Sequence, residues 1–399
     1  MEKVYAEAYK KIVDILSTYP DARLTVNISA TLTEQLQKYR LTYVLDKLVE
    51  LGESKQIEFT GSAKFHPIIP LIHAREAERQ ITLNEEANRE ILGSSYRPKG
   101  FFLPEMCYSR SAAEIVEKLK YEWLIIDEIA YTGRLGSLEA KQSKVYKLRD
   151  SKLKIFFKNR RFSGGITYGS FPNGADFLSA CEQEGMGREE GSEGYLLTGT
   201  DGEVYGHHRK GQEKLLIDLF KSKSLETATL SELLDTFELE ETEPVPSSWS
   251  TWEDELEADI PYPQWKFPGN IIHKWQWRLA ELATTAIHQA EEQGEVELGV
   301  RSSLDEGLHS CQWWWASCRP WWDVGMIKDG VNKLISAVRG VKSGIDERFL
   351  SEAEWLAKNI VTYAWDLHER RDAHRLQKEY LQTHTGVASL LTFGPGEER

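Results

Sequence analysis

The sequence predicts an α/β protein in which a parallel sheet or barrel precedes a helical C-terminal region. Two observations support this fold class. In the first half of the 399-residue chain, short apolar runs alternate with helix-length segments, which is the spacing expected of β/α units. From residue 249 onward the apolar spacing becomes helical, and this part holds 12 of the 13 tryptophans.

The expected strands are six short, mostly apolar runs, and several segments between them carry signals for the start of a helix. The runs are residues 24–28, 57–60, 101–104, 123–126, 154–157 and 195–198. Capping boxes, in which Thr or Ser precedes Glu by three residues, begin at Thr31, Ser111 and Thr229. The later part of the chain predicts long helices over residues 271–293, 326–339 and 351–383.

Chain length and one segment without periodicity predict the domain organisation. A single hydrophobic core stops growing near about 250 to 300 residues, so we expect two structural regions. Residues 238–248 are acidic, contain two prolines and lack helical or strand periodicity, which is typical of a linker or surface loop. We therefore expect a β/α domain over residues 1–237, a linker or surface loop over 238–265 and a helical domain over 266–399.

Charge and hydropathy argue against several classes of protein. The chain has 63 acidic and 49 basic residues, a net charge of -14 and no basic stripe, so we expect no nucleic-acid partner. No run approaches the roughly 20 apolar residues of a membrane span, and the first residues lack a signal-peptide core, which predicts a cytoplasmic protein. The four cysteines are scattered without CxxC spacing, so we expect no zinc site and no disulfide. Nothing in the sequence calls for a cofactor.

Glu105 is the first candidate for a chemical role. It follows the apolar run 101–104 and precedes Met106, at the position where parallel α/β proteins place their chemistry. A carboxylate beside so much apolar surface must be paired, hydrogen-bonded or shifted in pKa. A glutamate that points to solvent at the end of a strand fits the local sequence equally well.

Asp201 is the second candidate, because it lies in a segment dense in titratable groups. Glycines at 202 and 206 permit tight turns that could bring Asp201, Glu203, His207 and His208 to one cavity. A solvated turn with an exposed histidine pair is an equally valid interpretation of this segment.

Two further clusters combine polar and aromatic residues. Glu58 and Thr60 share one face of the predicted strand 57–60, and His66 follows it. Taken on its own, this cluster favours a strand edge with a capped turn. His309 and Trp313 belong to a tryptophan-rich segment, which suits either a carbohydrate cleft or a buried core.

Taken in order, these motifs resemble glycoside hydrolase family 57, from about residue 5 to about residue 340. The resemblance implies an incomplete seven-stranded β/α barrel followed by a helical region. It implies that Glu105, within residues 100–109, is the nucleophile and that Asp201, within residues 200–208, is the acid/base. The residues that the resemblance assigns to substrate binding are Glu58, His66, Glu203, His207, His309 and Trp313.

The sequence departs from the family pattern in two places. The family's first motif, His-Gln-Pro on the first barrel strand, has no counterpart, and the chain opens in the helix that should follow it. We therefore expect the first strand to be missing, with an exposed sheet edge that lowers solubility or is covered by a partner. In the last motif, Cys311 occupies the place where the family commonly has an aspartate.

The resemblance implies retaining cleavage of an α-glucan or maltooligosaccharide without a metal or cofactor. Hydrolysis and transglycosylation share this machinery, so the motifs do not separate them. Two other functions stay open: a non-catalytic or impaired α-glucan-binding family member, and a metal-dependent hydrolase that uses His207, His208 and an aspartate.

Overall fold

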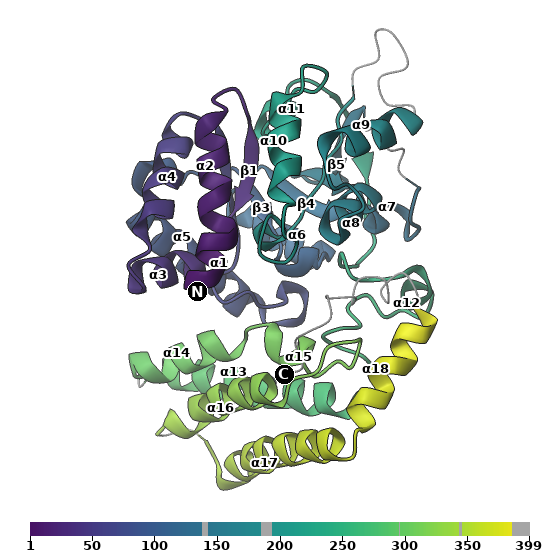
Figure 1. Ribbon diagram of the computed structural model, residues 1–399. Helices are drawn as coiled ribbons and strands as arrows, with labels where there is room; N and C mark the ends of the chain where they lie inside the picture. The colour runs from purple at the N-terminus through teal and green to yellow at the C-terminus, as the bar shows by residue number, and fades with distance from the viewer. Residues whose placement is uncertain (138–142, 185–193, 295, 343–344, 385–399) are drawn as a thin grey trace. The chain divides into compact units, whose positions relative to one another are not determined.

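The computed structural model describes residues 1–137, 143–184, 194–294, 296–342 and 345–384 (Figure 1). The chain divides into two compact units. Unit 1 consists of Met1–Lys64 and Ala77–Leu256, and unit 2 consists of Phe65–Glu76 and Glu257–Arg399. The expected domain boundaries stay predictions, and we describe each unit by itself.

A seven-stranded sheet forms the centre of unit 1, and its order is β1-β2-β3-β4-β6-β5-β7. The strands are β1 (Leu24–Asn27), β2 (Ile57–Gly61), β3 (Gly100–Phe102), β4 (Trp123–Asp127), β5 (Lys144–Leu148), β6 (Lys154–Lys158) and β7 (Glu238–Thr242). Strands β1, β2, β3, β4 and β6 pair in parallel, whereas β5 is antiparallel to β6 and parallel to β7. The predicted fold class, an incomplete β/α barrel with a helical C-terminal region, is confirmed.

Five of the six predicted runs form strands, and the prediction of a strand at the sixth, residues 195–198, is wrong. Residues 195–198 form no named strand, although the Leu197 carbonyl accepts a hydrogen bond of 2.8 Å from the Asn159 amide just after β6. Among the described residues, this backbone hydrogen bond does not extend into a ladder with β6, so the apolar run forms no strand of the sheet.

Strand β7 corrects the expectation that residue 238 begins a linker or surface loop. Its sequence, Glu-Leu-Glu-Glu-Thr, is almost all polar because it pairs on one side only and its side chains are largely exposed. Cross-strand ion pairs of Lys144 with Glu240 at 3.1 Å and of Lys147 with Glu241 at 3.2 Å join it to β5.

Helices alternate with the strands of unit 1. They are α1 (Glu2–Val4), the π-helical turn η1 (Tyr5–Tyr9), α2 (Lys10–Thr18), α3 (Ala30–Lys38), α4 (Thr42–Glu53), α5 (Ala74–Leu92), α6 (Arg110–Lys118), α7 (Ile129–Thr132), α8 (Arg160–Tyr168), α9 (Gly174–Gln183), α10 (Glu213–Lys221), α11 (Leu230–Leu233) and α12 (Glu253–Glu257). Helix α2 packs against α4 and α10 (Figure 1). The helical opening of the chain is as predicted.

The predicted capping boxes are confirmed only at Thr229, where both reciprocal hydrogen bonds form. Helices α3 and α6 begin earlier than Thr31 and Ser111, after Ser29 and Ser109. The Ser109 hydroxyl accepts a hydrogen bond from the backbone of α6, so the local N-cap preference was met two residues upstream.

Unit 2 is helical, as predicted. Its helices are α13 (Ile271–Glu292), α14 (Leu298–Gly307), α15 (Cys311–Trp314), α16 (Val324–Gly340), α17 (Glu347–Glu369) and α18 (Asp372–Thr383). The helix expected over residues 351–383 is two helices, because Arg371 adopts a left-handed conformation with φ of 59° between them.

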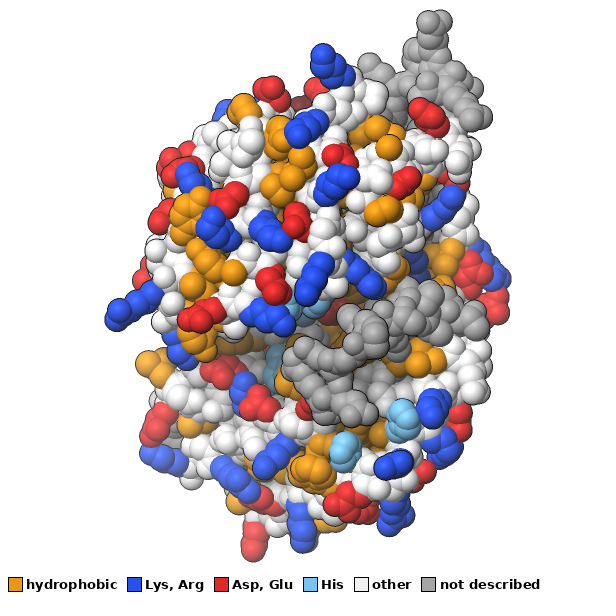
Figure 2. Space-filling view, in the orientation of Figure 1, with side chains coloured by type: hydrophobic (Ala, Val, Ile, Leu, Met, Phe, Trp, Pro, Cys, Tyr) orange, Lys and Arg blue, Asp and Glu red, His pale blue; other side chains and the backbone are white. Residues whose placement is uncertain are grey.

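The surface of the described residues carries both signs of charge. On the face shown in Figure 2, Lys and Arg side chains are interspersed with Asp and Glu. In the part of the chain that the structure describes, no helix is both long and apolar enough to cross a membrane.

Candidate active site

Glu105 follows β3 in a single 3-10 turn, η4 (Pro104–Met106). Glu105 and Met106 both have positive φ, 58° and 48°, a backbone strain of about 1–3 kcal/mol that is common at active sites. The Glu105 carboxylate accepts a hydrogen bond of 2.7 Å from the Trp249 indole. The Glu105 carbonyl accepts another, of 3.3 Å, from the Trp249 amide, so one residue holds both the side chain and the backbone of Glu105.

The environment of Glu105 shifts its ionisation. Burial raises the pKa of Glu105 to about 7, and the hydrogen bond from Trp249 opposes this rise because it favours the charged form. The expectation that this carboxylate is hydrogen-bonded and shifted in pKa is therefore confirmed.

A buried ion pair occupies the ends of the next two parallel strands. Asp127 ends β4 and Lys158 ends β6, and the two residues are only 1% and 5% exposed. Their Nζ and Oδ2 atoms are 3.1 Å apart. Burial lowers the pKa of Lys158, and the Asp127 charge opposes that change. The Lys158 ammonium lies 5.1 Å from the centroid of the Trp249 ring, within range of a cation–π interaction.

Arg160 connects this ion pair to the segment that carries Trp249. Its guanidinium lies 2.7 Å from the Asp127 carboxylate. It also donates hydrogen bonds to the carbonyls of Ser248 at 3.0 Å and Thr251 at 2.6 Å. The position of the indole that holds Glu105 therefore depends on charges at the ends of β4 and β6.

These supporting residues are not among those expected from the sequence. Asp127 and Lys158 directly follow the predicted runs 123–126 and 154–157, so the strand-end argument that selects Glu105 also selects them. No comparable local signal marks Arg160 or Trp249, because their roles depend on contacts distant in sequence.

Asp201 lies in a segment that packs beside the Glu105 turn. A Cβ placed on Gly199 would be 3.2 Å from Lys158 Cδ and 3.5 Å from Met106 Cε. Asp201 itself is exposed and precedes the 3-10 turn η5 (Gly202–Val204). The structure thus brings the two predicted carboxylate motifs to neighbouring positions at the ends of β3 and β6.

Glu203 and His207 bond to the first turns of the chain. The Tyr9 hydroxyl donates a hydrogen bond to Glu203 Oε1, and His207 Nδ1 lies 2.6 Å from Glu7 Oε2. The His207 and His208 rings lie 5.1 Å apart, and desolvation lowers the pKa of His208. Their predicted roles in substrate binding stay predictions.

Glu58 lies on β2, and both its carboxylate oxygens bond to Ser231 in the first turn of α11. Oε2 accepts a bond of 3.0 Å from the Ser231 amide, and Oε1 accepts one from the Ser231 hydroxyl. Burial raises the pKa of Glu58, and these bonds oppose the rise. The described contacts of Glu58 therefore stabilise a helix N-terminus, and its role in substrate binding stays a prediction.

The other three predicted residues belong to unit 2. His66 Nδ1 lies 3.1 Å from the Ser310 hydroxyl. Burial lowers the pKa of His309, the residue that precedes Ser310, to about 4. Trp313 is fully buried and stacks on Trp277 with centroids 4.1 Å apart. The structure thus brings His66 and the His309 segment together and places Trp313 in the core, while their binding roles stay predictions.

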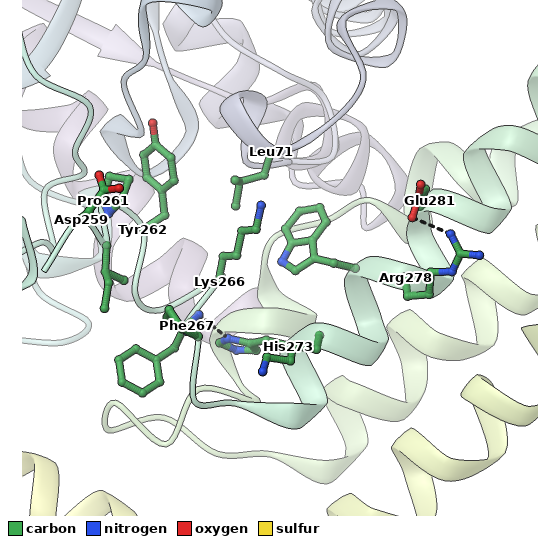
Figure 3. Close-up of a pocket in the computed structure, with 13 residues that line it drawn as sticks. Leu71, Asp259, Pro261, Tyr262, Lys266, Phe267, His273, Arg278 and Glu281 are labelled. Carbon is green, nitrogen blue, oxygen red and sulfur yellow. Dashed lines mark hydrogen bonds and ion pairs between the residues drawn. The ribbon is translucent and has the colours of Figure 1, made fainter.

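Unit 2 also contains a pocket of about 640 Å³ (Figure 3). Its lining residues are Leu71, Asp259, Ile260, Pro261, Tyr262, Lys266, Phe267, Pro268, His273, Lys274, Trp277, Arg278 and Glu281. Arg278 and Glu281 form a hydrogen bond of 2.9 Å with each other, which Figure 3 shows at one side of the pocket. None of the residues predicted from the sequence lines this pocket.

The described residues offer no metal centre: among them, no three or more His, Cys, Asp or Glu side chains are arranged to hold an ion. His207, which the metal-dependent hypothesis requires as a ligand, is bonded to Glu7.

The fold and this site define a class of protein: an incomplete β/α barrel that carries carboxylate side chains beyond the ends of its parallel strands. The chain belongs to glycosyl hydrolase family 57, whose family model matches residues 2–246. The family resemblance stated from the motifs is therefore confirmed.

Curated relatives match a short part of the chain. An alpha-amylase from Pyrococcus abyssi is 27% identical over 128 residues, which are 32% of this chain and 19% of the relative. A 4-alpha-glucanotransferase from Thermococcus litoralis is 23% identical over 127 residues, again 32% of this chain and 19% of the relative. The match thus spans about a fifth of the length of these relatives.

Solved structures share the fold over most of the chain. The 4-alpha-glucanotransferase from Thermococcus litoralis superposes with a TM-score of 0.66 and 16% identity, over 86% of this chain and 57% of that one. A GH57 branching enzyme from Thermococcus kodakaraensis superposes with a TM-score of 0.67 and 15% identity, over 89% of both chains. At these identities the likeness concerns the fold alone.

Proposed function

We propose that this chain cleaves α-glucosidic bonds with retention of configuration, with Glu105 as nucleophile and Asp201 as acid/base. The observation that carries the proposal is the Glu105 carboxylate, held by Trp249 beyond a parallel strand of a family 57 barrel. Relatives named as alpha-amylase, 4-alpha-glucanotransferase and branching enzyme support an α-glucan or maltooligosaccharide as the substrate.

The reaction would proceed in two displacements. Ionised Glu105 forms a bond to the anomeric carbon while Asp201 gives its proton to the departing glycosidic oxygen. Asp201 then takes a proton from water or from a sugar hydroxyl, which attacks the anomeric carbon and releases Glu105. The acceptor therefore decides between hydrolysis and glucan transfer.

The surroundings of the two carboxylates suit different tasks. Burial raises the pKa of Glu105 to about 7, and the hydrogen bond from the Trp249 indole opposes this rise by stabilising the charged form, which is the form that attacks. Asp201 is exposed, so its carboxyl group is accessible both to a leaving group that takes its proton and to a water molecule that returns one. A Cβ placed on Gly199 would lie 3.5 Å from Met106 Cε, so the segment that leads to Asp201 runs beside the Glu105 turn, as a retaining pair of carboxyl groups requires.

A mechanism-based label tests the proposal. We expect 5-fluoro-α-D-glucosyl fluoride to form a covalent adduct on Glu105 that peptide mass spectrometry locates. Asp201→Asn should still be labelled, because fluoride leaves without a proton, whereas Glu105→Gln should not. Folded wild-type protein that forms no adduct, or forms one on another residue, would overturn the proposal and favour the non-catalytic alternative.

A further inference from the structure

The loop of residues 201–208 is held by the helical segment that opens the chain. Two side-chain contacts join them: the Tyr9 hydroxyl donates to Glu203, and Glu7 Oε2 lies 2.6 Å from His207 Nδ1. Beyond the loop, Lys11 pairs with Glu213 at the start of α10 at 2.7 Å. Tyr9 and Glu7 belong to the π-helical turn η1, a local geometry frequent at functional sites. The turn therefore makes specific contacts with the segment that carries Asp201.

Close backbone packing accompanies these side-chain contacts. Gly206 has φ of 122°, and a Cβ placed on it would lie 2.1 Å from the Glu7 carbonyl oxygen. Only glycine fits between the loop and η1 at this position. The loop thus rests directly on the backbone of the opening helical segment.

The charges of Glu203 and Asp201 both act on the Tyr9 hydroxyl. Burial, the Glu203 charge and the Asp201 charge together raise the pKa of Tyr9, so the hydroxyl keeps its proton and remains a donor. Its proton is directed to Glu203, two residues from Asp201. A change at Tyr9 therefore acts on the acid/base segment without touching Glu105.

We propose that Tyr9 is a positioning residue for the acid/base step, because its hydrogen bond to Glu203 fixes the segment that carries Asp201. The inference rests on the proposed function. In the first displacement Asp201 must reach the glycosidic oxygen as the bond to the leaving sugar breaks and its proton moves to that oxygen. In the second it must reach the attacking hydroxyl and take its proton.

Comparison of leaving groups tests this role in catalysis. Tyr9→Phe should lower kcat/KM for maltoheptaose by about tenfold to about a hundredfold, the range for lost hydrogen bonds to charged groups. It should lower kcat/KM for maltosyl fluoride by less than about threefold, because fluoride needs no acid. Tyr43→Phe is the matched control, since it removes a 2.6 Å tyrosine–carboxylate bond, to Asp14, that does not involve residues 201–208. Equal losses on both substrates, or none, would overturn the inference.

Hydrogen exchange separates failure of this inference from failure of the proposed function. The His207 and His208 amides donate to the Glu203 carbonyl at 3.1 Å and 2.8 Å, so a loosened loop should expose them. We expect faster exchange in the peptide that spans 201–208 in Tyr9→Phe and unchanged exchange in Tyr43→Phe. This measurement needs no activity, whereas absence of a Glu105 adduct in wild type reports on the function alone. Unchanged exchange in Tyr9→Phe would show that Tyr9 does not position the loop.

Discussion

The two carboxylates of unit 1 are positioned by different means. Glu105 follows a strand that pairs on both sides, and the backbone and indole of Trp249 hold it in place. Asp201 follows a segment without strand structure, and its loop is held by side chains of the opening helical turns. Backbone pairing thus sets one position, and polar side-chain contacts set the other.

This difference has a consequence for substitutions. Single side-chain changes distant in sequence should move the Asp201 loop more easily than the Glu105 turn, because the sheet keeps Glu105 in register. The Glu105 turn should respond instead through the ionisation of Glu105, which burial and the hydrogen bond from Trp249 shift in opposite directions. Four predictions test this contrast.

The largest effect should come from Glu105→Gln. Loss of the nucleophile should lower kcat for maltooligosaccharides by about 10⁴-fold or more. Glu114→Gln, at an exposed residue of α6, is the control and should retain full activity. Substantial turnover by Glu105→Gln would mean that another group attacks the anomeric carbon.

Gly206→Ala should disturb the packing of the 201–208 loop against η1 and destabilise the protein. A Cβ 2.1 Å from the Glu7 carbonyl must displace backbone, so we expect a loss of about 4 kcal/mol in the free energy of unfolding. Gly211 is a matched control, because its φ of 86° is also positive and no atom lies within 4 Å of an added Cβ. Gly211→Ala should lose only about 1–2 kcal/mol in urea denaturation. Equal losses would remove the evidence for tight packing at Gly206.

The pH dependence of stability tests the burial of Glu105. Its pKa of about 7 in the folded protein exceeds the ordinary value of 4.5, so the folded state keeps a proton that the unfolded state has released. This group therefore lowers stability as pH rises from about 4.5 to about 7, by about 3 kcal/mol in total. Glu105→Gln does not titrate, so its stability relative to wild type should increase over that window. A constant difference in urea denaturation at pH 5 and pH 8 would show that Glu105 is not buried.

Trp249→Phe should have the smallest effect, a shift in the pH profile. Under the proposed function Glu105 must be ionised, so kcat/KM should fall as pH drops through about 7. Without the indole donor the charged form of Glu105 is less stabilised, so its pKa should rise. The acidic limb of the kcat/KM profile should therefore move to higher pH by about one unit. Trp252→Phe changes a tryptophan that stacks near Arg160 instead, and should leave the limb in place. An acidic limb that stays in place in Trp249→Phe would show that the Trp249 indole does not affect the pKa of Glu105.

The sequence predicts features that depend on local pattern. The predicted runs that carry β2, β3, β4 and β6 are apolar because these strands are mostly buried, whereas β1 is only partly buried. Glu105 stands out because it is a carboxylate directly after one of these apolar runs. Strand β7 could not be predicted in this way, because an edge strand with charged side chains has no apolar alternation.

Supporting contacts of the site depend on the folded arrangement and leave little local trace. The hydrogen bond from Tyr9 to Glu203 joins residues 194 positions apart, and the hydrogen bond from Arg160 to the Ser248 carbonyl joins residues 88 positions apart. Nothing in the neighbourhood of either residue identifies its partner. The ion pair of Asp127 and Lys158 can be predicted in part. The sequence places both residues at strand ends, but only the order of the strands shows that they are neighbours.

The Trp249 indole that holds Glu105 comes from 144 residues later in the chain. During synthesis at about 5–20 residues per second, the β3 turn would therefore wait several seconds or longer for its partner. Long-range contacts of this kind form late, because the intervening loop must close before they stabilise anything. The carboxylate environment is thus a product of the finished unit 1, and nascent chains that stop before residue 249 would carry Glu105 without the Trp249 indole.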